Sequence, residues 1–169
     1  MYMDRKMRHQ IFLCTSGNAP QLNFQIYQHS ESMKFFAKFV EMFRILAPYT
    51  KSLMDENTSS GIPLQRPLFL HYEHDPKTWN IAYQYMYGAD LLVASVLQPA
   101  QTTWAAYLPE GDDWVHLFHD VTYKGGQSVT VLAPVGSPPV FYRDGTGWKE
   151  LFQQVAAVMQ SPHRVKTEL

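Results

Sequence analysis

Potentially catalytic side chains are most concentrated in the segment His71-Tyr-Glu-His-Asp75. Imidazole and carboxylate groups can bind divalent metals or exchange protons near neutral pH. On an extended strand, however, His71 and Glu73 point to one face and His74 to the other, so the spacing does not suit a shared metal ion. Asp75 precedes Pro76, a pair typical of the N-cap and first residue of a helix. The sequence therefore predicts no metal site.

A polar loop that leaves a buried strand explains the same segment without any catalytic role. If the strand belongs to an α/β barrel, its C-terminal end is where such folds gather their functional groups. In that case His71 is a candidate substrate contact. The residues alone leave both interpretations open.

Other patterns that would indicate an enzyme are missing from the sequence. It contains no G-x-S-x-G nucleophile elbow. Gly125-Gly126-Gln127 and Gly145-Thr146-Gly147 are too short and wrongly placed to hold a phosphate, and we interpret them as hairpin turns. Cys14 is the only cysteine, so neither an internal disulfide nor a thiolate metal cluster can form within the chain. We expect no cofactor.

The composition indicates a folded chain with a large apolar surface to bury. Of 169 residues, 46% are hydrophobic, 14% aromatic and only 17% charged, against roughly 25% charged in an average domain. This composition excludes a disordered chain. Fourteen Lys and Arg residues balance fifteen Asp and Glu residues, giving a net charge of −1. A nucleic-acid-binding protein is therefore not expected.

No targeting signal is evident. The longest apolar runs, such as Leu91 to Leu97, fall well short of the roughly 20 residues that span a bilayer. The apolar stretch Ile11 to Cys14 is too short for the core of a signal peptide. We expect no membrane span and no signal peptide, and a cytoplasmic location by default.

The spacing of apolar residues predicts a long helix from Ser30. Ser30 is a suitable N-cap, and Glu31 is favourable in the first turn. A second apolar row widens the apolar arc, so we expect this helix to be covered on more than one side. Pro48 should interrupt the helix, and Gly61 should end the segment.

Short apolar runs occupy the rest of the chain. Pro67 to Tyr72 is predicted to be a buried strand, and a helix is predicted from Asp75-Pro76 to about Tyr87, ending at Gly88. A final amphipathic helix is predicted from Trp148. After Gly88, β-prone runs separated by turn residues indicate an antiparallel sandwich or barrel. These runs are Leu91–Leu97, Thr102–Leu108, Trp114–Phe118, Ser128–Leu132 and Pro139–Tyr142.

Several motifs, in this order, resemble the C-terminal part of glycoside hydrolase family 31 enzymes. They are Arg66-Pro-Leu-Phe-Leu-His-Tyr72, Asp75-Pro76, Gln84-Tyr-Met-Tyr-Gly88, Tyr107-Leu-Pro-Glu-Gly111, Trp114, Gly125-Gly126 to Val131, and Pro139-Val-Phe-Tyr-Arg143. The resemblance covers roughly residues 12 to 158. It leans toward the sulfoquinovosidase-like branch of these α-glucosidases because Asn23-Phe-Gln25, Phe36-Ala37 and Pro48-Tyr49 are similar to that branch.

The resemblance implies an α/β plus all-β fold, namely the last segment of a (β/α)8 barrel followed by an antiparallel β-sandwich and a short C-terminal helix. Residues 1–88 would be the C-terminal remnant of the catalytic barrel, with Pro67 to Tyr72 as its last strand. Residues 89–146 would form the proximal C-terminal β-sandwich, 147–160 the terminal helix and 161–169 a tail.

The resemblance also implies retaining hydrolysis of O-glycosyl α-linkages by two aspartates, both on barrel strands upstream of this sequence. No acidic residue here matches either motif, so no catalytic residue is expected. The family segment Arg-Thr-His-Glu-Gly-Asn-Arg-Pro corresponds to Leu13–Pro20, where Asn18 matches but Thr15 occupies the position of the sugar-binding His. The candidate substrate-binding residues are therefore Asn18 and His71, with Thr15 at the His position.

Two functions are consistent with these observations. The chain is a fragment or truncated paralogue of a family 31 glycosidase that is not competent alone, or it is a non-catalytic module that binds a glycan or a protein. Whether it is an enzyme by itself is left open. The expected partners are a carbohydrate or glycoside substrate in the intact family and a full-length relative, with neither nucleic acid nor a membrane span involved.

Overall fold

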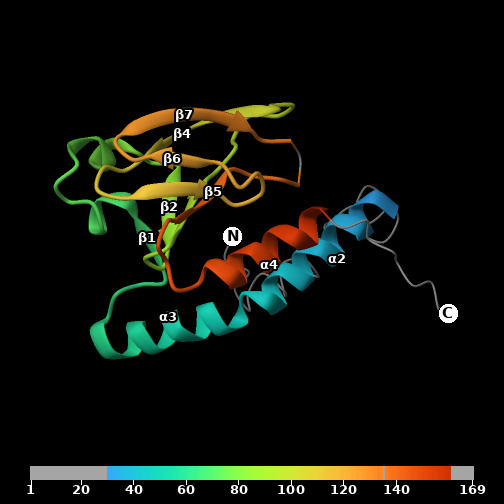
Figure 1. The fold of residues 1–169 in the computed structure, drawn as a ribbon, viewed down its shortest axis with the longest axis horizontal. Coiled ribbons are helices and arrows are strands. Elements are labelled where there is room, and N and C mark those ends of the chain that lie inside the picture. The colour runs from blue at the N-terminus through green and yellow to red at the C-terminus, as the bar shows by residue number, and fades with distance from the viewer. Residues whose placement is uncertain (1–29, 135, 161–169) are drawn as a thin grey trace, which may run out of the picture.

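The protein is built in three layers in the computed structural model, which describes residues 30–134 and 136–160. A two-stranded sheet, a six-stranded sheet and a layer of helices follow one another (Figure 1). The helices are α2 (Ser30–Ile45), α3 (Ala47–Ser60) and α4 (Lys149–Gln160), with short 3-10 helices η3 (Leu68–Leu70) and η4 (Pro76–Asn80). The strands are β1 (Gln65–Pro67), β2 (Gln84–Tyr87), β3 (Leu91–Ala94), β4 (Thr103–Leu108), β5 (Asp113–His116), β6 (Thr122–Lys124), β7 (Gln127–Leu132) and β8 (Val140–Arg143).

The predicted interruption of the first helix is confirmed. α2 ends at Ile45 and α3 begins at Ala47, with Pro48 in the first turn of α3. Proline fits there because the N–H groups of a first turn have no partner within the helix. Gly61 adopts the left-handed conformation, with φ 74°, and its N–H donates to the Asn57 carbonyl at 2.8 Å. Gly61 therefore ends the segment as predicted.

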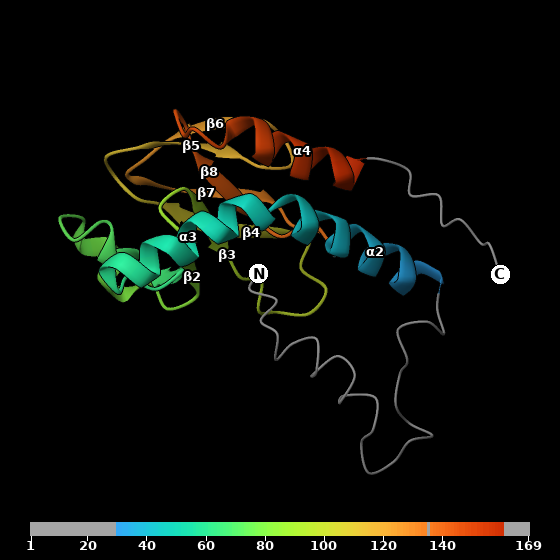
Figure 2. The ribbon, with the colours of Figure 1, turned by 90° about the horizontal axis from the view of Figure 1, so that it is seen from below.

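The expected covering of α2 on more than one side is not found among the described residues. Met42 is its only buried residue there, and Val40 is 46% exposed. α4 packs beside α2 (Figure 2), and Lys38 Nζ donates to the Met159 carbonyl at 2.8 Å. The wide apolar arc of α2 is thus only partly used by the described part of the chain.

The prediction of a strand over Pro67 to Tyr72 is wrong. The strand is β1, which ends at Pro67, and the apolar residues after it form η3. β1 pairs antiparallel with β2, and the described residues contain no parallel strand pair. Because residues 68–70 are helical and β1 pairs antiparallel, this segment does not form the parallel barrel strand that was expected. The barrel part of the predicted fold is not seen in the described residues.

The helix predicted from Asp75 to Tyr87 is much shorter than expected. Asp75 is the N-cap, as predicted, and its carboxylate accepts from the Lys77 N–H at 3.1 Å. The helix is η4, which ends at Asn80, and residues 84–87 form β2 instead. β2 lies between β1 and β3, and these ladders outweigh the local helical preference. The sheet therefore contains strands from both sides of the predicted boundary at residue 88.

Gly88 forms the turn between β2 and β3 rather than a helix end. Its φ is +66°, and its N–H donates to the Leu64 carbonyl at 2.7 Å. The hydroxyl of Tyr49, from α3, is placed beside it and donates to the Tyr87 carbonyl at 2.8 Å. The glycine is required both by the backbone conformation and by the close approach of the helix.

Replacement of Gly88 by Ala should destabilise the protein by about 2 kcal/mol. An added Cβ would overlap Tyr49 Oη and Leu53 Cδ2, and φ would remain positive. Gly61→Ala is the matched control, because φ is also positive there but the space is open. It should cost only about 1 kcal/mol. Urea unfolding of the two variants measures the difference, and equal losses would contradict the packing argument.

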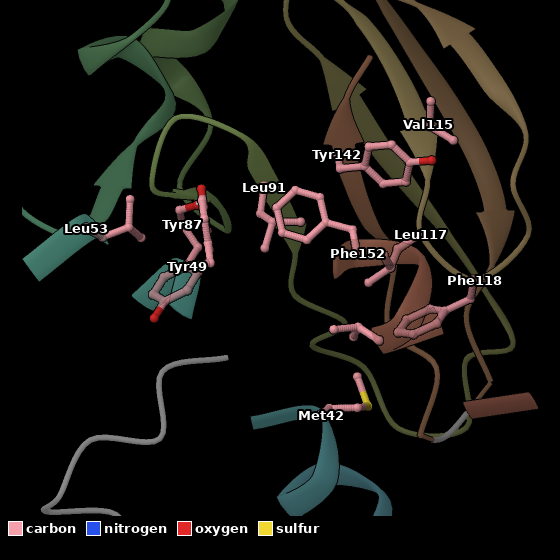
Figure 3. Close-up of a cluster of buried hydrophobic side chains, with 11 residues drawn as sticks. Met42, Tyr49, Leu53, Tyr87, Leu91, Val115, Leu117, Phe118, Tyr142 and Phe152 are labelled. Carbon is pink, nitrogen blue, oxygen red and sulfur yellow. The ribbon is translucent and has the colours of Figure 1, made fainter. Parts of the chain in front are cut away.

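The six-stranded sheet is buried on both faces because neighbouring residues along its strands alternate between two cores. Its strand order is β1-β2-β3-β8-β5-β6, and β4 pairs with β7 in the second sheet. Met86, Leu92, Trp114 and Phe141 face the two-stranded sheet, whereas Tyr87, Leu91, Val115 and Tyr142 belong to the core shared with the helices. Figure 3 shows this second set in one cluster with Phe152 of α4, whose ring lies between Leu91 and Tyr142.

All five predicted β-prone runs overlap a strand, and the terminal helix is confirmed as α4. β6 was not predicted. The interpretation of the two glycine pairs as hairpin turns is wrong. Gly125-Gly126 connects β6 of one sheet to β7 of the other, and Gly145-Thr146-Gly147 leads from β8 to α4. No helix among the described residues is long and apolar enough to cross a membrane.

Candidate functional site

His71 lies at the end of η3 and is held by Arg66, whose side chain is fully buried. Arg66 Nη1 donates to His71 Nε2 at 2.7 Å, and Arg66 Nε donates to the Pro63 carbonyl at 2.6 Å. Arg66 Nη2 also donates to a Glu56 carboxylate oxygen of α3. One guanidinium thus joins α3, the loop before β1 and the end of η3.

The protonation state of His71 follows from this contact. A guanidinium has no acceptor, so the Nε2 that receives its hydrogen bond must carry no proton. Burial lowers the pKa of His71, and the positive charge of Arg66 lowers it further. A neutral imidazole held in this way can donate from Nδ1 to a ligand. Its role as a substrate contact stays a prediction.

Asp75 binds groups from two separate segments. Tyr107 Oη donates to it at 2.5 Å and the Glu110 N–H at 3.1 Å, in addition to the Lys77 N–H of its own helix. Burial by itself would raise the pKa of Asp75, but the hydrogen bond from Tyr107 and those from the two backbone N–H groups outweigh burial and lower it. Asp75 is therefore a structural carboxylate that fixes η4 against the β4–β5 connection.

The other polar residues of the segment do not join His71 and Asp75 in one site. His74 and Glu73 are exposed, with His74 Nε2 at 3.4 Å from Glu73 Oε1. No group of three His, Cys, Asp or Glu side chains within the described residues could hold a metal ion. Thr15 and Asn18 lie outside the described residues.

A groove beside this segment was not predicted from the sequence. It has a volume of about 590 Å³ and lies between η3, η4 and the adjoining ends of β1–β3. Phe69 and Trp79 stack in it with ring centroids 5.0 Å apart and planes 12° apart, and Tyr83 also lines it. We call it the aromatic groove. Its sequence signal was the aromatic residues in 69–83, a range that was assigned to a strand and a helix.

Comparison with known proteins places these features in a family. The model of the glycosyl hydrolase family 31 C-terminal domain matches residues 61–146. The sulfoquinovosidase of Escherichia coli K12 is 44% identical over 142 residues, which are 84% of this chain and 21% of that protein. The sulfoquinovosidase of Agrobacterium fabrum C58 is 43% identical over 142 residues, with the same two coverages.

Solved structures agree with these relatives. The family 31 sulfoquinovosidase of E. rectale, in complex with the aza-sugar inhibitor IFGSQ, aligns with a TM-score of 0.79 and 43% identity. The alignment covers 83% of this chain and 21% of that one, so the chain spans about a fifth of the length of its relatives. The match of the antiparallel β domain to the family model, together with these identities, shows that the chain belongs to glycosyl hydrolase family 31 and corresponds to its C-terminal part.

Proposed function

We propose that this chain is the C-terminal portion of a retaining α-glycosidase and does not hydrolyse glycosides by itself. The observation that carries the proposal is the extent of the match, which covers only about a fifth of the relatives' length and includes the family's C-terminal domain. Two relatives that are 43–44% identical are sulfoquinovosidases. The substrates proposed for the intact protein are therefore α-linked sulfoquinovosides.

The carboxylates of the described residues support the absence of catalysis. Retaining hydrolysis requires two carboxyl groups about 5 Å apart, one of them a general acid with a raised pKa. The buried carboxylates here are Asp75 and Asp90. Asp75 has a lowered pKa, and Asp90 accepts from Arg143 Nη2 at 3.0 Å. Both carboxylates are thus engaged in structural contacts.

We also propose a division of the chain near residue 61, between α3 and β1. Under this proposal, α2 and α3 belong to the end of a catalytic barrel, and the β domain begins with β1. The proposal is supported by the family model, which begins at residue 61, and by the pairing of β1 and β2 with the rest of the six-stranded sheet.

The purified chain should hydrolyse 4-nitrophenyl α-sulfoquinovoside and 4-nitrophenyl α-glucoside no faster than buffer does.

A chimera tests whether this chain can serve as a C-terminal domain. In the chimera, this chain replaces the matching 142 residues of the E. coli relative. Because the catalytic residues would come from that relative, the chimera should retain hydrolysis within about tenfold of the parent, or about 1.4 kcal/mol in the transition state. Hydrolysis by the chain alone would contradict the proposal.

A second candidate function is a non-catalytic glycan-binding module. The observation that favours it is the aromatic groove, which presents exposed aromatic rings without requiring any catalytic carboxylate.

A further inference from the structure

The aromatic groove combines a fixed indole with an open ring face. Trp79 is 59% exposed although Phe69 stacks on one of its faces. Its Nε1 donates to the Glu73 carbonyl at 3.2 Å, which fixes the orientation of the ring. Tyr83 is 62% exposed and lines the same groove. Patches of large exposed apolar side chains are often binding sites.

The groove is held in place by the structural contacts of η4. Asp75 caps η4 and also binds Tyr107 and the Glu110 N–H. On the other side, the Ser95 N–H donates to the Tyr83 carbonyl at 3.0 Å. The indole of Trp79 therefore loses little conformational freedom when a ligand binds, which favours affinity. In Figure 1 the η3–η4 region lies at the end of the molecule opposite α2, and no residue of α2, α3 or α4 lines the groove.

The lining of the groove favours an uncharged ligand. It contains no acidic residue, and its only basic residue, Arg66, is already paired with Glu56. Gln65, Asn80 and Ser95 add amide and hydroxyl groups around the rings. The volume of about 590 Å³ falls within the usual range for small-ligand sites.

We propose that the aromatic groove binds neutral hexose units of a polysaccharide. The C–H face of a pyranose ring would lie on the open face of Trp79, with Tyr83 against a neighbouring unit, since aromatic rings attract such polarised C–H groups. The amides of Gln65 and Asn80 would bind sugar hydroxyls. The inference rests on the second candidate function and does not require hydrolysis.

Native electrophoresis of the full chain in gels that contain dextran or soluble starch tests this site. The wild type should be retarded in at least one of them. Trp79→Ala and Tyr83→Ala should each weaken binding by about tenfold or more, which is about 1.4 kcal/mol. Leu132→Ala is the matched control, because Leu132 is 58% exposed on β7, away from the groove. It should migrate like the wild type.

The test has clear contrary outcomes. Absence of retardation in both polysaccharides, or equal retardation of all variants, would overturn the glycan site. If sedimentation shows that the wild type self-associates and Trp79→Ala does not, the groove is a protein contact and the proposal is wrong. Trp79→Phe keeps a stacking ring and should restore part of the binding, which separates loss of the site from loss of the fold. Polysaccharide binding and 4-nitrophenol release are measured in separate experiments. The absence of polysaccharide binding would therefore not change the conclusion drawn from the hydrolysis assay.

Discussion

Replacement of Arg66 by Leu is expected to destabilise the protein by about 3 kcal/mol. The buried guanidinium donates to three groups, from Glu56, Pro63 and His71, that come from different segments. Leu fills part of the space but donates to none of them. A hydrogen bond from a charged group contributes more than a neutral one, and the Pro63 carbonyl would lose its partner. The thermal midpoint should fall by roughly 10 °C.

Two matched variants separate the contributions of charge and geometry at Arg66. Arg66→Lys keeps the charge but cannot reach three acceptors with one compact ammonium, so it should recover less than half of the loss. Glu56→Gln should cost only about 1 kcal/mol, because the Gln amide oxygen can still accept from Arg66 Nη2 and the lost charge lies on a side chain that is 37% exposed. Thermal unfolding of the three variants checks this order. A midpoint for Arg66→Leu within about 2 °C of the wild type would show that the network contributes little.

The sequence predicted the β domain well where the local signal and the tertiary structure agree. The strand runs after Gly88 and the helix interruption at Pro48 were predicted because alternation and proline act within a few residues. β2 was mistaken for helix because Gln84–Tyr87 becomes a strand only through its pairing with β1 and β3. Pairing between distant residues cannot be derived from local spacing, and the same limit explains the error at Pro67 to Tyr72.

The candidate site shows a similar division. The capping role of Asp75 was predicted because it depends on the neighbouring Pro76. Its bonds to Tyr107 and Glu110 join residues more than thirty positions apart, so no spacing rule could reveal them. The contact between Arg66 and His71 spans only five positions, but it requires the turn of η3, which was not predicted. Trp79 was predicted to lie in a longer helix, and its place in a groove could not be derived because η4 ends at Asn80.

Acidification from pH 7.5 to pH 4 is expected to remove about 3 kcal/mol of stability through His116 alone. His116 is only 1% exposed, and burial, followed by the charge of nearby His119, lowers its pKa from 6.5 to about 4. Each unit of difference between the folded and unfolded pKa corresponds to about 1.4 kcal/mol of stability. Because the pKa of His116 is lower in the folded state, the unfolded chain binds this proton at a higher pH than the folded chain does. Stability is therefore fully present above pH 6.5, falls between pH 6.5 and 4, and levels off below.

The hydrogen bonds of His116 explain why the neutral form is preferred. The Phe118 N–H donates to His116 Nδ1 at 3.2 Å, and the His119 ring nitrogen lies 3.1 Å from the same atom. Nδ1 must therefore be an acceptor, which places the proton on Nε2. Nε2 is buried and has no hydrogen-bond partner among the described residues. Protonation of Nδ1 would oppose the Phe118 N–H donor and place a charge in an apolar core beside Phe141.

A comparison of pH profiles isolates His116 from the carboxylates that titrate in the same range. His116→Leu should lose about 1 kcal/mol at pH 7.5, since the Phe118 N–H loses its acceptor. Between pH 6.5 and 4.5, however, its stability should fall less steeply than that of the wild type. His74→Gln removes an imidazole that is 96% exposed and should leave the wild-type profile unchanged. Parallel urea-unfolding profiles for the wild type and His116→Leu would show that a different group controls the acid sensitivity of this fold.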